Sequence, residues 1–161
     1  MIVAAIDPGL DGAYAIRDDK HTWCEPIDNG RPYDPYHIAV DLEASGVTRV
    51  LIEDIESFPG KSSMSATITS AKNWGRLYEA IRGQGIGIVV IRSSEWKRGM
   101  KLSDGKATPK QKKERAIALA KQLYPSANLK RSEKCKNDHD GMAESLLILE
   151  WGLRSRLLEV K

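Results

Sequence analysis

Four acidic residues stand where apolar segments of this chain end or begin. Asp7 directly follows the apolar run IVAAI, and Glu53 directly follows VLI. Asp140 and Glu144 are four residues apart, so they share one face if this segment is helical. Carboxylate oxygens are hard ligands that suit Mg²⁺ or Mn²⁺. These residue types therefore indicate a metal site assembled from separate elements.

Acids contributed by three separate elements are what a two-metal site needs. Two ions roughly 3.5–4 Å apart can activate a water molecule and stabilise the leaving oxygen during phosphodiester hydrolysis. Clustered carboxylates also repel one another unless cations lie between them, so the metal-free site should be strained. The acids therefore indicate a site for two Mg²⁺ ions, or Mn²⁺ in their place, with the ligands that such hydrolysis needs.

Purely structural roles also explain some of these acids. Asp7 precedes a Pro-Gly pair that must turn the chain, and its carboxylate can accept backbone hydrogen bonds in that turn. Asp138 and Asp140 can stabilise a helix N-terminus, an ordinary effect of about 0.3–1 kcal/mol. Capping does not explain Glu144, which lies one turn further in and beside the apolar face.

Apolar patterns predict the elements that position these acids. Runs of apolar residues without a helical period are typical of buried strands, whereas spacings of three and four are typical of helices. The predicted strands are residues 2–6, 12–16, 21–27, 47–55 and 86–94, and the predicted helices are residues 34–46, 62–83, 108–125 and 138–159. Thr108 and Pro109 open the third helix as N-cap and first helical residue. Residues 97–107 are expected to form a mobile loop.

The order of these elements predicts the fold class. Three successive strands, followed by helices that alternate with strands, indicate an α/β protein with a mixed sheet covered on both faces. A length of 161 residues suits a single domain, residues 1–161, and 41% hydrophobic and 29% charged residues suit a globular one.

Charge is distributed unevenly along the chain. Residues 1–56 carry 4 Lys/Arg against 12 Asp/Glu, whereas residues 97–136 carry 13 Lys/Arg against 3 Asp/Glu. The second segment therefore has a net charge of +10. An acidic half and a basic segment suit an enzyme that collects cations at one place and a polyanion at another.

Other sequence features limit the location of the protein. No stretch approaches the roughly 20 apolar residues of a membrane span. The first residues enter a strand at once and leave no room for a signal peptide. Cys24 and Cys135 do not make a disulfide framework or a zinc site. We therefore expect a cytoplasmic protein that does not bind membranes.

Four motifs follow one another along nearly the whole chain: IDPGLDGAYAI, VLIEDI, SSEWK and DHDGMAESLLI. In this order they resemble the RuvC-like Holliday junction resolvases, most closely the compact bacteriophage and prophage members. The resemblance implies the ribonuclease-H-like fold, a five-stranded mixed sheet with three antiparallel strands and flanking helices. It also implies a homodimer that nicks two opposed strands of a four-way DNA junction with divalent metal, leaving 5′-phosphate and 3′-hydroxyl ends.

Position by position, the resemblance assigns metal binding and catalysis to Asp7, Glu53 and Glu144. The family usually has another aspartate three residues before the last acid, where this chain has Gly141. Asp140, at a spacing of four, is the natural substitute, and Asp138 is a weaker candidate. The expected catalytic and metal-binding set is Asp7, Glu53, Asp140 and Glu144.

The resemblance also implies residues that contact DNA. Lys97 matches a lysine that follows the fifth strand and faces the DNA backbone. The candidates for a second such lysine, on the next helix, are Lys110, Lys112 and Lys113. Phe58, five residues after Glu53, matches at a slightly different offset an aromatic residue that lies at the junction centre.

Two other functions remain open from the sequence. An Asp-x-Gly sequence followed by glycine also begins the phosphate loop of actin-like kinases, although those proteins need two such domains. A protein that binds junctions without cutting them is the second alternative, and the retained acids argue against it. His139 suits a helix start as well as a base or metal ligand. Trp74, Trp96 and Trp151 are expected in the core or an interface.

Overall fold

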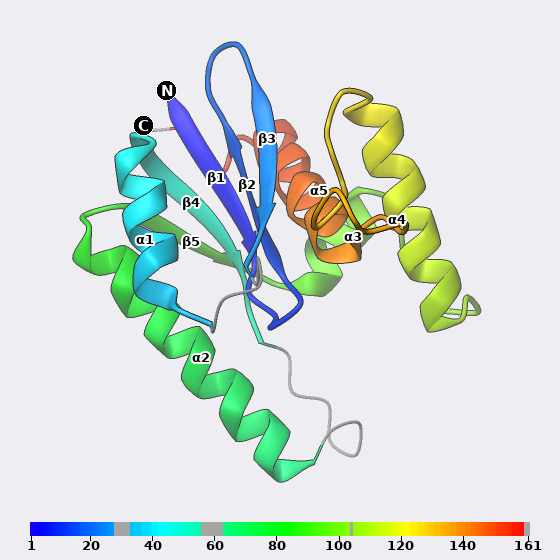
Figure 1. Cartoon of the computed structure of the whole chain (residues 1–161), viewed down its shortest axis with the longest axis horizontal. Helices are drawn as coiled ribbons and strands as arrows, with labels where there is room; N and C mark the ends of the chain where they lie inside the picture. The colour runs from blue at the N-terminus through cyan, green and yellow to red at the C-terminus, as the bar shows by residue number, and fades with distance from the viewer. Residues whose placement is uncertain (28–32, 56–62, 104, 160–161) are drawn as a thin grey trace.

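A computed structural model describes residues 1–27, 33–55, 63–103 and 105–159, and a five-stranded sheet forms its centre (Figure 1). The strands are β1 (Ile2–Asp7), β2 (Ala13–Arg17), β3 (Thr22–Pro26), β4 (Val47–Glu53) and β5 (Gly87–Ile91). Their order across the sheet is β3-β2-β1-β4-β5. The first three strands pair antiparallel, whereas β4 runs parallel to both β1 and β5. The predicted mixed sheet is confirmed, and β1 lies at its centre.

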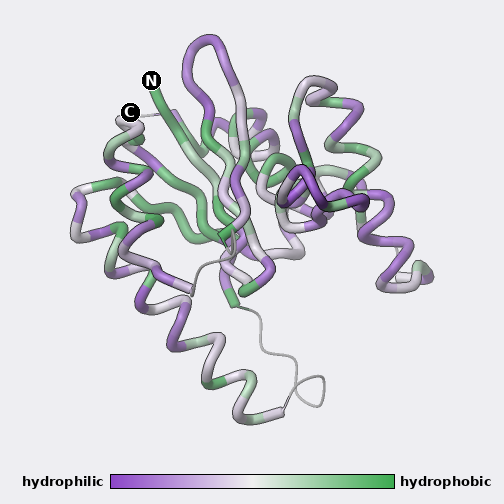
Figure 2. Tube along the Cα trace, viewed as in Figure 1, coloured by the Kyte–Doolittle hydropathy of each residue, from purple (hydrophilic) through white to green (hydrophobic). Residues whose placement is uncertain are grey.

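Helices cover both faces of this sheet (Figure 1). They are α1 (Pro35–Ala44), α2 (Met64–Gly83), α3 (Ser93–Gly99), α4 (Pro109–Leu123) and α5 (Asp140–Arg154). Alternate residues of β1 enter two separate cores, since successive side chains of a strand point to opposite faces. Val3 and Ala5 pack in the core that contains α5, whereas Ala4 and Ile6 pack in the core that contains α1 and α2. Figure 2 shows the hydrophobic residues concentrated in the strands between these layers.

Local signals fix the start of α4 as predicted. The Thr108 hydroxyl accepts a hydrogen bond from the main-chain nitrogen of Gln111, and the Gln111 side chain accepts one from the main-chain nitrogen of Thr108. This reciprocal capping box satisfies two donors that the first helical turn leaves unpaired. Pro109 is the first residue of the helix. The helix therefore begins at a defined point and presents its lysines at fixed positions.

The segment after β5 differs from the prediction. The predicted strand 86–94 ends at Ile91, and α3 occupies its last residues and the start of the predicted loop 97–107. The Glu95 carboxylate accepts a hydrogen bond from the main-chain nitrogen of Arg92 at 3.2 Å and so helps to start α3. A helix of about two turns has too few residues to show a repeating apolar period.

The first half of α2 is more exposed than its apolar spacing predicted. Leu77, Ala80 and Ile81 are buried, but Met64 is 76% exposed and Ile68 is 47% exposed. Figure 1 shows the reason, since the start of α2 extends beyond the edge of the sheet and has no strand beneath it.

Two further elements are shorter than predicted. The strand expected at 47–55 ends at Glu53, and the helix expected at 138–159 spans Asp140–Arg154.

The strand β5 lies at the edge of the sheet, so its Val90 is 43% exposed. Within the described ranges, no helix is both long and apolar enough to cross a membrane.

Candidate active site

The strands β1 and β4 place Asp7 and Glu53 at one edge of the sheet. The two strands are parallel neighbours, and Ile6 pairs with Ile52. The residue after each member of this pair therefore emerges at the same carboxyl end, where open α/β sheets usually bind their ligands. Asp7 is the last residue of β1, and Glu53 is the last residue of β4.

The helix α5 brings Glu144 to the same edge because its first turn packs on the β1–β2 connection. Gly141 is buried there, and a Cβ at this position would overlap the main-chain oxygen of Asp11. The missing side chain allows this close approach of helix and turn. A side chain at position 141 would force the two elements apart, so an acid three residues before Glu144 does not fit this packing.

Glu53 and Glu144 are close enough to Asp7 for their charges to raise its pKa. Burial, followed by the charges of Glu144 and Glu53, raises the pKa of Asp7 to about 8. The turn hydrogen bond considered from the sequence is present, because the main-chain nitrogen of Gly9 donates to Asp7 Oδ1. At 3.5 Å this bond is long, and it opposes the rise only weakly. Three of the four predicted acids thus form one crowded cluster.

Two tryptophans hold Glu53 in this cluster. The Nε1 of Trp96 donates to Glu53 Oε2 at 2.6 Å, and the Nε1 of Trp74 donates to the main-chain oxygen of Glu53 at 2.8 Å. Burial raises the pKa of Glu53, although Lys97, Trp96 and Ser93 act in the opposite direction. Trp96 is fully buried, as expected of a core residue, but its bond to the acid was not predicted.

Lysines of the basic segment neutralise the acids of α5. Lys97 Nζ lies 3.3 Å from Glu144 Oε2, and Lys113 Nζ lies 2.5 Å from Asp140 Oδ2. Burial acts to lower the pKa of Lys97, but the charges of Glu144 and Glu53 raise it overall. Burial acts to raise the pKa of Asp140, but its bond to Lys113 lowers it overall. Asp140 is therefore an ionised carboxylate with a lysine partner.

The segment before α5 provides structural contacts. Asp138 precedes the helix, and its Oδ2 lies 2.6 Å from Lys121 Nζ. His139 is the N-cap residue, since its Nδ1 accepts a hydrogen bond from the main-chain nitrogen of Met142 at 3.2 Å. Of the two explanations for His139, the structure supports the helix start.

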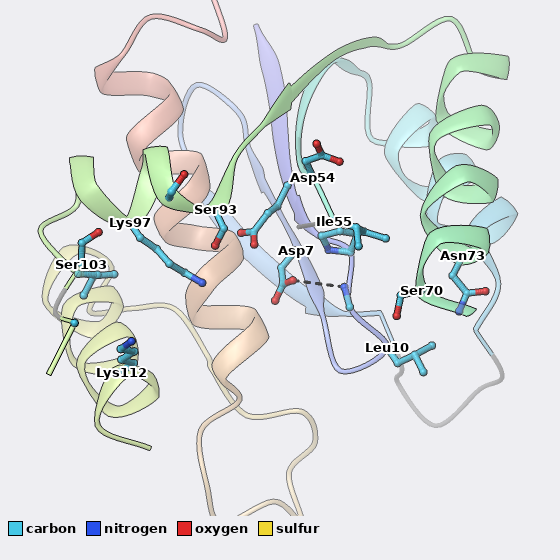
Figure 3. A pocket seen from close by; sticks show the side chains of 16 residues that line it. Asp7, Leu10, Asp54, Ile55, Ser70, Asn73, Ser93, Lys97, Ser103 and Lys112 are labelled. Carbon is cyan, nitrogen blue, oxygen red and sulfur yellow. Dashed lines mark hydrogen bonds between the residues drawn. The ribbon is translucent and has the colours of Figure 1, made fainter. Parts of the chain in front are cut away.

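A cavity of about 730 Å³ runs along this edge of the sheet (Figure 3). Asp7 and Glu53 both line it, and Figure 3 shows Asp7 near its middle, Ser70 and Asn73 of α2 on one side, and Ser103 on the side of α3 and α4. Hydroxyl and amide groups are common donors to phosphate and sugar oxygens in protein–DNA complexes. The lining therefore combines acids that suit a cation with donors that suit a nucleic-acid backbone.

The predicted DNA-binding residues lie at different distances from this cavity. Lys97 and Lys112 line it, and Figure 3 shows Lys97 pointing from α3 towards Asp7. Lys110 lies further out, with its side chain 87% exposed and its Nζ 3.9 Å from Glu114. Phe58 lies outside the described residues.

The chemistry of the acidic cluster fits a divalent metal. Its carboxylates are hard oxygen donors, and Asp7 is held where its own charge is unfavourable without a nearby cation. Among the described residues, no three acidic, histidine or cysteine side chains are grouped closely enough to hold one ion as they stand. The Lys97 ammonium group lies among these acids.

Comparison with known proteins gives matches at the level of structure. No family model and no curated protein matches the sequence. Thermus thermophilus RuvC in complex with a Holliday junction substrate matches with a TM-score of 0.59, 13% identity and 96% of each chain covered. The chain has the ribonuclease-H-like fold of RuvC.

One viral resolvase and one yeast resolvase also match in structure. Fowlpox virus resolvase, in complex with Holliday junction DNA, matches with a TM-score of 0.51 and 19% identity over 99% of this chain and 100% of that one. The yeast mitochondrial Holliday junction resolvase Ydc2 matches with a TM-score of 0.53 and 15% identity over 97% of this chain and 79% of that one. At these identities the matches establish the fold, so the function must be argued from the site.

Proposed function

We propose that this protein is a divalent-metal-dependent endonuclease that resolves four-way DNA junctions. The observation that carries the proposal is the meeting of Asp7, Glu53 and Glu144 with Lys97 at the carboxyl edge of the central strands. The fold supports it, since resolvases from a bacterium, a virus and yeast mitochondria share it.

The metal would be held by three acids: Asp7, Glu53 and Glu144. Asp140 would join them by giving up its ion pair with Lys113 and binding the metal instead. Mg²⁺ or Mn²⁺ bound there would activate a water molecule and neutralise charge on the scissile phosphate, a task that two ions can share. Without a cation the acids would repel a DNA phosphate. The acidic cluster thus restricts cleavage to the metal-loaded protein.

The residues of the cavity would position the DNA strand. Lys97 would contact the scissile phosphate and offset the charge that develops on its oxygens. Lys112 and the polar groups Ser70, Asn73 and Ser103 would hold the backbone on either side. In-line attack by water then leaves a 5′-phosphate and a 3′-hydroxyl.

The basic segment 97–136 would bind the arms of the junction. Its net charge of +10 suits contacts to phosphates, which give affinity without reading sequence. Paired nicks on opposed strands need two sites, so we infer that the active form is a homodimer. The motifs suggest the bacteriophage and prophage type of resolvase.

A cleavage assay tests the proposal. Synthetic four-way junctions, three-way junctions and linear duplexes of equal length are incubated with Mg²⁺ or with chelator and separated on a denaturing gel. We expect cleavage of the four-way junction with Mg²⁺ and none with chelator. Binding of the four-way junction without cleavage in Mg²⁺ or Mn²⁺ would favour the alternative of a non-cleaving junction-binding protein.

A further inference from the structure

The indole of Trp96 is fully buried, and its single donor points at Glu53. The distance from Nε1 to Oε2 is 2.6 Å, which is short for a nitrogen donor and a charged acceptor. An indole N–H donates but cannot accept, so Glu53 Oε2 is the acceptor of this bond, and the bond is stronger when the carboxylate is ionised. A buried ring also cannot follow the carboxylate if it rotates. Trp96 therefore fixes the place of one oxygen of Glu53.

Neighbouring contacts fix the rest of this residue. The main chain of Glu53 is held at the end of β4 by the Trp74 indole, at 2.8 Å. Ser93, the first residue of α3, also hydrogen-bonds to the Glu53 carboxylate through its side chain. Lys97, the residue after Trp96, reaches Glu144 at 3.3 Å. Adjacent residues of α3 thus contact two acids that come from β4 and α5.

The helix α3 is itself held by close packing. Gly99 lies against the Trp151 indole of α5, and a Cβ at Gly99 would overlap that ring. Met100, which follows the helix, is buried in the same core as Trp96. A short helix docked in this way can hold a side chain to the tolerance that a metal site needs.

We propose that Trp96 is a positioning residue, which holds Glu53 so that its carboxylate is presented to a divalent metal ion in one orientation. The inference rests on the proposed nuclease function. Partners that orient a metal ligand through a hydrogen bond typically change metal affinity or activity by about 10–100-fold when they are removed. Removing the Trp96 N–H while keeping the ring should therefore weaken metal binding by about this factor.

The test replaces Trp96 with 3-benzothienylalanine, an isostere in which sulfur takes the place of the N–H group. Mn²⁺ binding to the DNA-free protein is measured by electron paramagnetic resonance, which needs no cleavage. The control is the same replacement at Trp151, which also packs on α3 but lies against Gly99. We expect weaker Mn²⁺ binding for the Trp96 isostere than for the wild type. The Trp151 isostere should bind Mn²⁺ almost as tightly as the wild type, and its thermal stability should equal that of the wild type.

A second measurement follows the Trp96 indole resonance by nuclear magnetic resonance during a Mg²⁺ titration. We expect it to shift as Mg²⁺ binds, and we expect Glu53→Gln to abolish that shift. Unchanged Mn²⁺ affinity in the Trp96 isostere would overturn the positioning role while leaving the nuclease proposal intact. Mn²⁺ binding that weakens when the Trp96 N–H is removed, in a protein whose wild type cuts no DNA, would refute the nuclease and retain the positioning role. A wild type that binds no Mn²⁺ would overturn both.

Discussion

Lys97 of α3 and Glu144 of α5 form an ion pair across the carboxyl edge of the sheet, with 3.3 Å between Nζ and Oε2. This pair joins the basic segment to the acidic cluster. It offsets part of the repulsion among the acids when no metal is bound. A metal ion that takes over Glu144 would leave the Lys97 charge available to a DNA phosphate. Metal binding and phosphate binding should therefore favour each other.

The stability of the metal-free protein should depend on Asp7 and on pH. A carboxyl group whose pKa is higher in the folded chain stabilises the fold while it is protonated. Burial, Glu144 and Glu53 raise the pKa of Asp7 from 3.8 to about 8, so this stabilisation is lost as the pH rises between these values. In chelator, Asp7→Asn should match the wild type near pH 4 and exceed its melting temperature near pH 8.

Thermal unfolding of both proteins in chelator at several pH values measures this difference. Lys97 faces Asp7 and opposes the effect, so the comparison is made with Lys97 intact. Melting temperatures of the two proteins that run parallel across the range would contradict the shifted pKa. Near pH 8, Mg²⁺ should raise the melting temperature of the wild type and so remove most of the advantage of Asp7→Asn.

The acids around the start of α5 should differ in importance. Asp140→Asn and Glu144→Gln should each lower the cleavage rate by several orders of magnitude, because each removes a proposed metal ligand. Asp138→Asn should have a much smaller effect, since Asp138 is paired with Lys121 before the helix. Single-turnover rates with saturating enzyme measure all three. A greater loss from the Asp138 variant would mean that Asp138 is the ligand in place of Asp140.

Gly141 should not tolerate a side chain. A Cβ there overlaps the main-chain oxygen of Asp11, so Gly141→Ala should destabilise the protein by about 1–3 kcal/mol. Gly75 of α2 is the matched control, because nothing lies within 4 Å of a Cβ at that position. Gly75→Ala should stabilise by roughly 0.5–1 kcal/mol, as expected inside a helix. Urea unfolding compares the variants, and a Gly141→Ala protein as stable as the wild type would refute this packing.

Lys97 should contribute to both DNA binding and cleavage. The logarithm of affinity should fall linearly with the logarithm of salt, with a slope of roughly −0.9 per phosphate contact. Lys97→Ala should flatten this slope by about one contact per bound chain and slow cleavage beyond its effect on binding. Lys20→Ala is the control, since Lys20 lies in the β2–β3 turn at the other end of the sheet. An unchanged slope for Lys97→Ala at fixed Mg²⁺ would place the DNA on another face.

The fold and part of the site follow from local sequence pattern. Asp7 and Glu53 each end an apolar run, and parallel neighbouring strands bring such ends together. Thr108 and Pro109 mark the start of α4 for equally local reasons. These features depend on residues close in sequence, so the sequence alone predicts them.

The contacts made by α3 depend on tertiary packing and were not predicted. The helix is too short to show a period, and the Trp96 bond to Glu53 joins residues 43 positions apart. The lysine partners of Asp140 and Glu144 likewise depend on how α3 and α4 pack against α5. From the sequence, Gly141 was noted only as the position where an acid is absent. Its packing role was not predicted, because the contact with Asp11 joins residues far apart in the sequence.

Mapping of nicks on an end-labelled immobile four-way junction tests the central claim most directly. Wild-type protein with Mg²⁺ should produce paired nicks on two opposed strands, and DNA ligase should reseal them because they carry 5′-phosphate and 3′-hydroxyl ends. Asp7→Asn should bind the same junction at least as tightly and produce no nicks. Cleavage by Asp7→Asn at a near-normal rate, or wild-type binding that never leads to a nick with Mg²⁺ or Mn²⁺, would contradict a nuclease centre built on Asp7.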